Sequence, residues 1–207
     1  MRLSKRITDL ALALLLALVL WPLLLGICLF ILLRDGRPIF YLSERMKTPD
    51  QAFVLWKFRT MTTAPEDSGV SGGDKTTRIT TTGRFLRKTR LDELPQLLNI
   101  LRGDISFVGP RPPLRYYVEK HPELYARVLK HRPGVTGLAT LRYHRTEERL
   151  LAMCRTADET DQVYSRRCVP VKARLDMIWA TNQSLCFDLK LMLETVIRVI
   201  GVSSKRR

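Results

Sequence analysis

The sequence has few residues of the types that build metal sites or disulfide frameworks. Its four cysteines form no Cys-x-x-Cys pair and its three histidines are scattered, so neither residue type has the spacing of a structural zinc site. We therefore expect free thiols in a reducing compartment. The chain contains no internal repeat, and 11 glycines and 11 prolines in 207 residues exclude a fibrous or disordered protein. This length is typical of one domain, or of one domain with an attached element.

Acidic residues are also scarce. The chain has 20 Asp and Glu against 35 Lys and Arg, which gives a formal net charge of +15. Such a charge favours an anionic partner: nucleic acid, an anionic membrane surface or a phosphorylated substrate. No nucleic-acid-binding motif is recognisable. The Gly- and Ser-rich segment 65–77 lacks the Gly-Lys-Ser/Thr ending of a P-loop, and we interpret it as a mobile surface loop.

One long apolar run stands near the N-terminus. Residues 10–33 carry no charge over 24 positions. At ~1.5 Å per residue, a helix of this length spans about 36 Å, more than the ~30 Å hydrocarbon core of a bilayer. The run exceeds the ~7–15 residues of a signal-peptide core, and no Ala-x-Ala cleavage site follows it. The sequence therefore predicts a helix that is embedded in a membrane.

The topology of this helix stays open on these residues alone. Pro22 lies near the centre of the run, where it removes a backbone hydrogen bond and predicts a kink. Lys and Arg flank both ends, at residues 2–6 and 34–37, whereas a spanning helix normally has its positive charges on the cytoplasmic side. A re-entrant helix and a spanning helix are both compatible with the pattern.

The remaining chain predicts an α+β domain that is mainly helical, with short strands. The expected strands are 39–41, 52–58 and 106–108, with a turn over 134–137. The expected helices are 82–101 (with a second helix starting at Pro95), 114–132 (with a kink or a boundary at Pro122), 146–164 (one helix or a pair), 171–179 and 185–200. The helix over 185–200 is amphipathic, and a basic tail over 201–207 follows it. Its apolar face suits either an anionic membrane surface or the protein core.

The densest chemical signal lies between Arg78 and Arg111, where basic residues surround the single acidic pair Asp92-Glu93. Arg84, Arg87 and Arg90 are spaced by three, so they can present guanidinium groups along one side of a helix. A solvated charged surface is one interpretation. The other is a phosphate site, because guanidinium binds phosphate in bidentate fashion and a carboxylate among cations stays ionised, ready to act as nucleophile or metal ligand.

Several longer motifs carry a resemblance to a known family. They are Lys57-Phe58-Arg59-Thr60-Met61, Arg78-Ile79-Thr80, Gly83-Arg84-Phe85-Leu86-Arg87, Leu91-Asp92-Glu93-Leu94-Pro95-Gln96 with Asn99, Arg102-Gly103-Asp104, Ser106-Phe107-Val108-Gly109-Pro110-Arg111-Pro112, Arg132-Pro133-Gly134-Val135-Thr136-Gly137 and Phe187-Asp188-Leu189-Lys190. In this order they cover nearly the whole chain, together with the proline-centred apolar helix. The sequence resembles the bacterial sugar transferase family, the monotopic polyprenyl-phosphate phosphoglycosyl transferases.

The resemblance implies a reaction and a set of site residues. Family members transfer a sugar-1-phosphate from a UDP-sugar to a polyprenyl phosphate, typically undecaprenyl phosphate, and release UMP in a ping-pong mechanism. Carried over to this sequence, Asp92 is the nucleophile and Glu93 its partner, and both hold Mg²⁺ as the cofactor. The expected substrate-binding residues are Lys57, Arg59, Arg78, Arg84, Arg87, Gln96 and Arg111. For these basic residues, structural salt bridges or contacts with a membrane surface are the competing interpretation.

The resemblance also implies a membrane topology. It favours a re-entrant helix over residues 1–34, broken at Pro22, and a catalytic domain over 35–207 on the cytoplasmic face of the bacterial inner membrane. Membrane lipids are then partners, nucleic acid is not, and a homodimer through the soluble part is left open. The chain departs from the family at Trp21, where many members have serine, and in the longer, more charged segment 145–171, which suits sugar specificity or a partner.

Two other functions compete with the transferase. A basic, membrane-tethered protein that binds anionic lipid or nucleic acid explains the net charge and the amphipathic C-terminal helix, but gives no reason for Asp92-Glu93 inside the arginine stripe. A conventional glycosyltransferase transfers the sugar without its phosphate, and it would release UDP in place of UMP.

Overall fold

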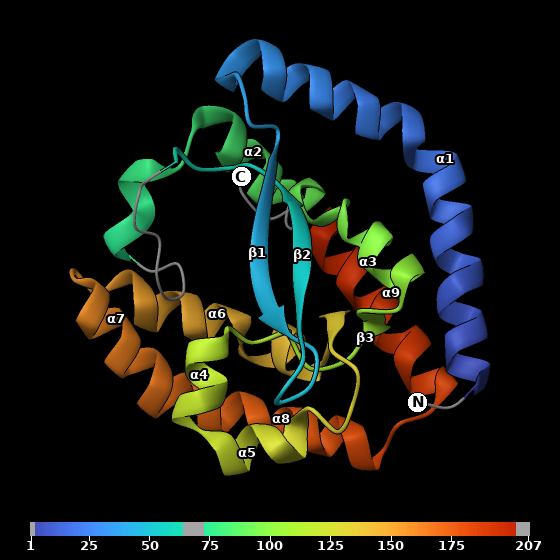
Figure 1. The fold of residues 1–207 in the computed structure, drawn as a ribbon, viewed down its shortest axis with the longest axis vertical. Helices are drawn as coiled ribbons and strands as arrows, with labels where there is room; N and C mark the ends of the chain where they lie inside the picture. Colours follow the sequence, from blue (N-terminus) through green and yellow to red (C-terminus); the bar gives the residue numbers. More distant parts are fainter. Residues whose placement is uncertain (1–2, 64–72, 202–207) are drawn as a thin grey trace.

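The computed structural model describes residues 3–63 and 73–201, and it is a mainly helical α+β fold with short strands and a long apolar N-terminal helix (Figure 1). This confirms the predicted fold class at that level. The elements are α1 (Leu3–Asp35), β1 (Phe40–Met46), β2 (Ala52–Phe58), a 3₁₀ helix (Gly73–Arg78), α2 (Thr81–Thr89), a second 3₁₀ helix (Leu91–Glu93), α3 (Gln96–Arg102), β3 (Ser106–Val108), α4 (Arg115–Lys120), α5 (Pro122–Val128), β4 (Gly134–Thr136), α6 (Leu138–Ala152), α7 (Ala157–Val163), a π-helical turn (Tyr164–Cys168), α8 (Val169–Thr181) and α9 (Leu185–Gly201).

Two predicted segments fall largely outside the described residues. The loop predicted over 65–77 is described only from Gly73 onward, where it enters the first 3₁₀ helix. Of the basic tail predicted over 201–207, only Gly201 is described, as the last residue of α9.

Helix α1 runs through Pro22 without ending and is bent into two arms that wrap around one side of the domain (Figure 1). Proline has no amide hydrogen to donate, and its ring pushes against the preceding turn, which accounts for a bend in this helix. Large apolar side chains are exposed along both arms, including Leu14, Leu18, Trp21 and Leu29. By length and composition, α1 is the one helix among the described residues that is apolar enough to cross a membrane.

The N-terminal arm of α1 is tied to the domain by buried polar contacts. The Lys5 ammonium lies 2.5 Å from the Asp188 carboxylate of α9, and the Trp179 indole N–H donates to the other oxygen of Asp188 at 2.9 Å. Lys5 and Asp188 are only 6% and 3% exposed. Arg6 donates to the carbonyl of Ile100 at the end of α3. These contacts explain the Phe-Asp-Leu-Lys motif, because its aspartate anchors the long apolar helix α1.

The other end of α1 is tied to the same domain. Arg59, directly after β2, donates from its guanidinium to the carbonyls of Asp35 and Gly36 at 2.6 and 2.8 Å. These carbonyls have no partner within the helix, so the arginine satisfies groups that every helix C-terminus leaves open. The Asp35 carboxylate in turn accepts hydrogen bonds from the hydroxyls of Thr80 and Thr82. Both ends of α1 therefore contact one folded unit.

The strands form two separate two-stranded sheets. β1 and β2 are an antiparallel hairpin in which Phe40 lies opposite Phe58. The prediction of strands over 39–41 and 52–58 was correct in place, although β1 extends to Met46. The hairpin orients the side chain of Lys57 toward the cavity described below.

The predicted turn over 134–137 was wrong, because Gly134–Thr136 forms β4, which pairs in parallel with β3. The four residues 134–137 have glycine at both ends, which is typical of a turn when the remote partner strand is not known. The glycines are required by close backbone approach: a Cβ on Gly134 would lie 2.2 Å from the backbone nitrogen of Gly109. The Gly-Pro-Arg-Pro and Arg-Pro-Gly-Val-Thr-Gly motifs are thus the two sides of one backbone crossing.

Two predicted helices are divided. The helix expected over 82–101 ends at Thr89, because Arg90 adopts a left-handed conformation with φ of 58°. Pro95 precedes the first turn of α3, so the predicted start of a second helix at this proline is confirmed. The helix or helix pair expected over 146–164 is a pair, α6 and α7, although α6 begins earlier, at Leu138. The boundary predicted at Pro122 is confirmed, since α5 begins there.

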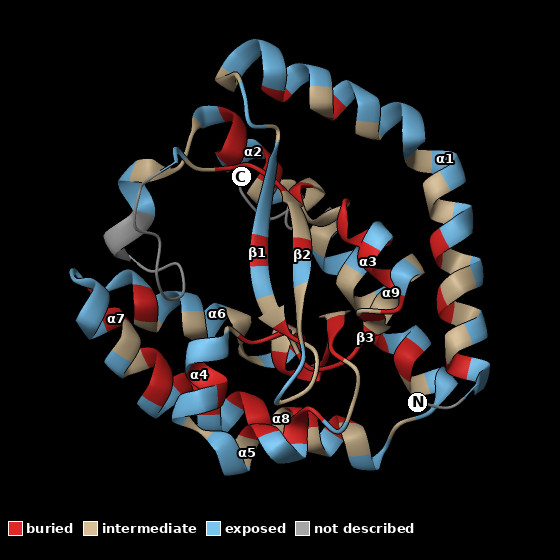
Figure 2. Ribbon diagram, in the orientation of Figure 1, coloured by how far each residue is buried: buried red, intermediate tan, exposed pale blue. Residues whose placement is uncertain are grey.

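The largest buried cluster joins the lower helices α4, α5, α6 and α8 through residues such as Tyr117, Tyr125, Leu151 and Val169. Figure 2 shows buried residues on the inward sides of these helices, whereas α1 is mostly exposed or intermediate. All four cysteines are free, as predicted.

Candidate active site

The acidic pair lies in the 3₁₀ helix between α2 and α3. Arg90 turns the chain with its left-handed conformation, so that Leu91 and Leu94 pack against the apolar cluster below α1. Asp92 and Glu93 are then left at the wall of a cavity. A non-glycine residue with positive φ is strained, and such strain is found most often at functional sites.

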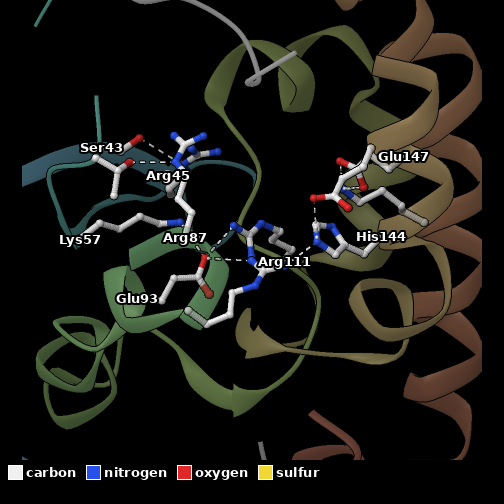
Figure 3. Close-up of polar contacts among 12 residues, drawn as sticks. Ser43, Arg45, Lys57, Arg87, Glu93, Arg111, His144 and Glu147 are labelled. Atoms are coloured by element: carbon white, nitrogen blue, oxygen red, sulfur yellow. Dashed lines mark hydrogen bonds and ion pairs between the residues drawn. The ribbon is translucent and has the colours of Figure 1, made fainter. Parts of the chain in front are cut away.

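Glu93 is held by cations. Its Oε1 atom accepts from the Lys57 ammonium at 2.8 Å and from the Arg111 guanidinium at 3.0 Å, and Arg90 lies at 3.9 Å (Figure 3). Burial favours the neutral acid, but these three cations outweigh it and hold the pKa of Glu93 well below its usual range. Glu93 in turn raises the pKa of Arg111. Glu93 is therefore an ionised carboxylate whose Oε1 atom is held by Lys57 and Arg111.

Asp92 has a different environment, although it is the next residue. It is 8% exposed, and its Oδ1 atom is buried without a hydrogen-bond partner among the described residues. Burial, followed by the adjacent charge of Glu93, raises the pKa of Asp92, while Lys57, Arg90 and Arg87 act in the opposite direction. The described protein groups therefore leave the hydrogen-bonding capacity of the buried Oδ1 unused.

The dyad opens into a cavity of about 1660 Å³. Its wall is strongly basic, and the cations that line it are Arg45, Lys57, Arg59, Arg78, Arg87, Lys88, Arg90, Arg111, Arg145, Arg149, Lys172 and Arg198. Leu16 and Leu20 of α1 line the same cavity, so the apolar helix and the carboxylates share one space. Such a wall suits a ligand that is both anionic and attached to an apolar chain.

The structure brings most of the predicted site residues together. Asp92, Glu93, Lys57, Arg59, Arg78, Arg87, Gln96 and Arg111 all line the cavity. Arg84 is exposed on α2 and is not among the described lining residues. Arg59 binds the end of α1, and Arg78 donates to the Thr62 carbonyl, so these two cations also have structural partners. Pro22 lies in α1, away from the dyad.

Sequence reasoning missed other residues of this wall. Arg45 from β1 lines the cavity. The Nε2 atom of His144, in α6, lies 2.6 Å from a guanidinium nitrogen of Arg90. Glu147 and Asp176 of the later helices line it as well. The one available signal was the length and charge of segment 145–171, which does not by itself indicate which side chains turn inward.

The donor set for a magnesium ion is restricted to the dyad. No group of three His, Cys, Asp or Glu that could hold a metal occurs in the part of the chain that the structure describes. Mg²⁺ in phosphoryl-transfer sites is commonly bound by one or two carboxylates and completes its shell with substrate phosphates and water. The Oδ1 of Asp92, which has no hydrogen-bond partner among the described residues, fits that pattern.

Fold and site together define a class: a protein with a long, bent apolar helix that borders a cationic cavity built around one carboxylate pair. Residues 1–202 match the family model described as bacterial sugar transferase, so the chain belongs to the bacterial sugar transferase family.

Its relatives span most of the chain but differ in length. It is 35% identical over 198 residues to the uncharacterized sugar transferase EpsL of Bacillus subtilis, covering 95% of this chain and 87% of EpsL. It is 38% identical to a UDP-glucose:undecaprenyl-phosphate glucose-1-phosphate transferase of Caulobacter vibrioides, covering 94% of this chain and 68% of that protein. The Escherichia coli protein of the same description is 34% identical, and the match covers 95% of this chain but only 40% of that longer protein.

Proposed function

We propose that this protein transfers a sugar-1-phosphate from a UDP-sugar to undecaprenyl phosphate and releases UMP, the first membrane step in the assembly of an exopolysaccharide or similar glycoconjugate. The observation that carries the proposal is the buried Oδ1 of Asp92, which has no partner among the described residues, beside a Glu93 whose Oε1 is paired with Lys57 and Arg111. The activities in the names of the Caulobacter vibrioides and Escherichia coli relatives support it.

In the first half-reaction, the Asp92 carboxylate attacks the sugar-bearing β-phosphorus of the donor. A bond forms between the carboxylate oxygen and phosphorus, and the bond from phosphorus to the bridging oxygen breaks. UMP leaves with that oxygen. An anionic nucleophile approaches an anionic diphosphate only when cations offset the repulsion. Arg87, which lies close enough to Asp92 to lower the pKa of its carboxyl, and Arg111 supply positive charge at this point.

Glu93 acts as a positioning residue in this scheme. A carboxylate whose pKa lies well below its usual range is a poor proton donor near neutral pH. Its hydrogen bonds hold Lys57 and Arg111 on one side of the cavity, where both can meet the donor phosphates. We therefore assign to Glu93 the orientation of two cations.

In the second half-reaction, a phosphate oxygen of the lipid attacks the same phosphorus. The bond to Asp92 breaks, the free carboxylate returns, and the sugar is left on a polyprenyl diphosphate. Leu16 and Leu20 of α1 line the cavity that holds Asp92, so a lipid phosphate can reach the dyad while its chain stays beside the membrane helix. One active site then serves both substrates in turn.

Magnesium is the cofactor that this chemistry suggests. Asp92 would hold it through Oδ1, with Glu93 as the second carboxylate of the pair. A bound Mg²⁺ would neutralise charge on the donor diphosphate.

The membrane helix is proposed to be re-entrant, with its break at Pro22 and the domain 35–207 on the cytoplasmic face of the bacterial inner membrane. Contacts at both ends of α1 support this, since Lys5 binds α9 and Asp35 binds the start of α2. A helix that crossed the bilayer would carry one of its ends to the opposite side, away from the domain.

Helix α9 is proposed to lie on the membrane surface along one side. Five of its apolar side chains are exposed: Leu185, Leu189, Leu193, Val196 and Ile197. Spacing by four, and then by three or four, places them in one stripe. The opposite side of the helix buries Asp188 and Leu191 in the domain. The remaining apolar stripe suits the lipid interface, where a basic chain is also attracted to anionic headgroups.

Nucleotide release tests the proposed function. The protein in lipid particles with Mg²⁺ would be given a panel of UDP-sugars, with and without undecaprenyl phosphate. Sustained UMP release that requires the lipid phosphate and one UDP-sugar is the expected result. Release of UDP would indicate a conventional glycosyltransferase. Absence of any nucleotide release, with salt-sensitive binding of DNA or anionic lipid, would indicate a binding protein.

A further inference from the structure

The cavity continues beyond Arg111 into a second polar region. Figure 3 shows Arg111 between Glu93 on one side and His144 and Glu147 of α6 on the other. Farther along, Lys172 and Asp176 of α8 line the same cavity. The proposed phosphate chemistry uses none of the residues on this α6–α8 side, so their presence at the wall needs a reason.

Lys172 and Glu147 are a matched pair. The Lys172 ammonium lies 3.0 Å from a Glu147 carboxylate oxygen and 3.2 Å from the Tyr164 hydroxyl. Lys172 is only 9% exposed. Glu147 therefore balances the charge of Lys172, and Glu147 and Tyr164 both accept its hydrogen bonds. These contacts hold one turn of α8 against α6.

Asp176 is not matched. It follows Lys172 by one helical turn, is 7% exposed and lines the cavity. No hydrogen bond or ion pair joins it to another residue within 3–63 or 73–201. Burial raises its pKa to about 7, and Lys172 opposes the shift. A buried polar group without a partner is costly unless a ligand or water supplies one.

We propose that Asp176, supported by the Lys172–Glu147 pair, binds hydroxyl groups on a sugar ring of the donor nucleotide. The inference rests on the proposed function, because it takes the donor to be a UDP-sugar. Arg111 separates this region from the dyad, so phosphates that contact Arg111 would place an attached ring on the α6–α8 side. A carboxyl group pairs well with ring hydroxyls, and Tyr125 and Val169 give the same wall apolar surface for the ring itself.

Both the glycosyl group and the ribose of a UDP-sugar carry such hydroxyls. The chemistry that Asp176 would recognise is the same for both, and the experiment has to separate them. UMP retains the ribose and lacks the glycosyl group, so its affinity reports on the ribose alone.

The test compares Asp176→Leu, which keeps the approximate volume but cannot hydrogen-bond, with Asp176→Asn, which retains part of that capacity. Asp161→Asn is the matched control, because Asp161 pairs with Lys120 and does not line the cavity. Steady-state UMP release would give kcat and the donor KM at saturating undecaprenyl phosphate. The expected result is a KM raised about tenfold by Asp176→Leu and less by Asp176→Asn, with kcat within about twofold of wild type.

Two further measurements identify the ring. If Asp176 binds the glycosyl group, the rise in KM differs between UDP-glucose and its epimer UDP-galactose, and inhibition by UMP is unchanged. If Asp176 binds the ribose, the KM values of both donors and the inhibition constant of UMP rise by the same factor. An unchanged KM for both donors and unchanged UMP inhibition in Asp176→Leu would overturn the proposal. A lower melting temperature with loss of kcat alone would also overturn it, since that combination indicates a structural role.

Binding without turnover separates this inference from the proposed function. UDP-glucose and UDP-galactose would be titrated into the Asp92→Asn protein, with and without Asp176→Leu, in a calorimeter. Tenfold weaker binding on addition of Asp176→Leu supports the hydroxyl pocket even if the wild type releases no UMP, which would refute the transferase instead. Equal binding, or none to either protein, overturns the pocket.

Discussion

At the scale of single residues, the site depends on the contrast between two adjacent carboxyl groups. Glu93 is satisfied by Lys57 and Arg111, whereas Asp92 keeps one oxygen without a protein partner. Adjacent acids with unlike environments take unlike roles, because the paired group is stabilised as an anion and the open group is free to react. The Leu-Asp-Glu-Leu-Pro-Gln motif identified both residues from the sequence, but their different partners come from distant parts of the chain.

Other residues of the wall could not be predicted from the sequence. In the sequence, nothing distinguishes Asp176 from other acidic residues on helices, and its burial results from the packing of α8 against α5 and α6. Nothing distinguishes Arg90 from the neighbouring arginines either, although its left-handed conformation turns the dyad toward the cavity. Both properties depend on tertiary packing, which residue spacing does not encode.

The buried Asp176 carboxyl predicts an unusual dependence of stability on pH. Its pKa in the folded protein is about 7, above the ~3.9 of an unfolded chain, so the folded state binds the extra proton between these values. The free energy of unfolding should therefore fall as pH rises from 4 to 7. The groups around it, Lys172, Tyr125 and Glu147, include one cation that limits the effect.

Asp176→Asn removes the titrating carboxyl group and with it the predicted fall in stability at higher pH. The difference in free energy of unfolding between this variant and wild type should therefore shift in favour of the variant by about 2 to 4 kcal/mol from pH 4 to pH 8. Urea unfolding in detergent at a series of pH values measures it. Asp161→Asn should show almost no such change between pH 4 and pH 8, because Lys120 helps to lower the pKa of Asp161 and its contribution therefore changes only below about pH 4. A difference between Asp176→Asn and wild type that does not change with pH would contradict the account.

At the scale of elements, α1 and the two short sheets arrange the site. The proline-centred run was predictable because its length and lack of charge leave few alternatives. β4 was not predictable, because its three residues form a strand only by pairing with β3. The paired residues Ser106 and Gly134 are 28 positions apart in the sequence. The division of α2 from α3 was missed for a related reason, since no glycine marks the left-handed residue.

The contact between α1 and α9 gives a prediction at this scale. Asp188→Ala leaves the Lys5 ammonium buried without its counter-charge, which should cost about 3 to 5 kcal/mol of stability. Denaturant unfolding in detergent measures the loss. The double variant Lys5→Met with Asp188→Leu removes both charges and should recover most of it. A loss below about 1 kcal/mol for Asp188→Ala would show that the pair does not anchor the helix.

At the scale of the whole molecule, both arms of α1 belong to one body. Polar contacts fix its first residues to α9 and α3 and its last residues to the loop before α2. The apolar surface lies between these two anchors, and the basic cavity opens beside it. In the function that we propose, this arrangement lets a nucleotide sugar and a lipid phosphate reach the same carboxylate.

Labelling of single cysteines tests this topology. Ser4→Cys and Asp50→Cys, each in a protein whose four native cysteines are replaced by serine, place one exposed thiol in the first turn of α1 and one after the helix. Both should react with a membrane-impermeant maleimide only after the cells are opened. Reaction of one of the two in intact cells would mean that α1 crosses the bilayer.

The most direct test of the central claim is the mass of the protein after a half-reaction. Purified protein would be mixed with its UDP-sugar and Mg²⁺ without lipid acceptor, quenched in acid and analysed as intact protein and as peptides. We predict one equivalent of UMP, a mass increase equal to one sugar phosphate on the peptide that contains Asp92, and loss of the adduct when undecaprenyl phosphate is added. Asp92→Asn should form no adduct and should lower turnover by at least about a thousandfold. Full turnover by Asp92→Asn, or an adduct on another residue, would contradict the assignment of Asp92 as the nucleophile.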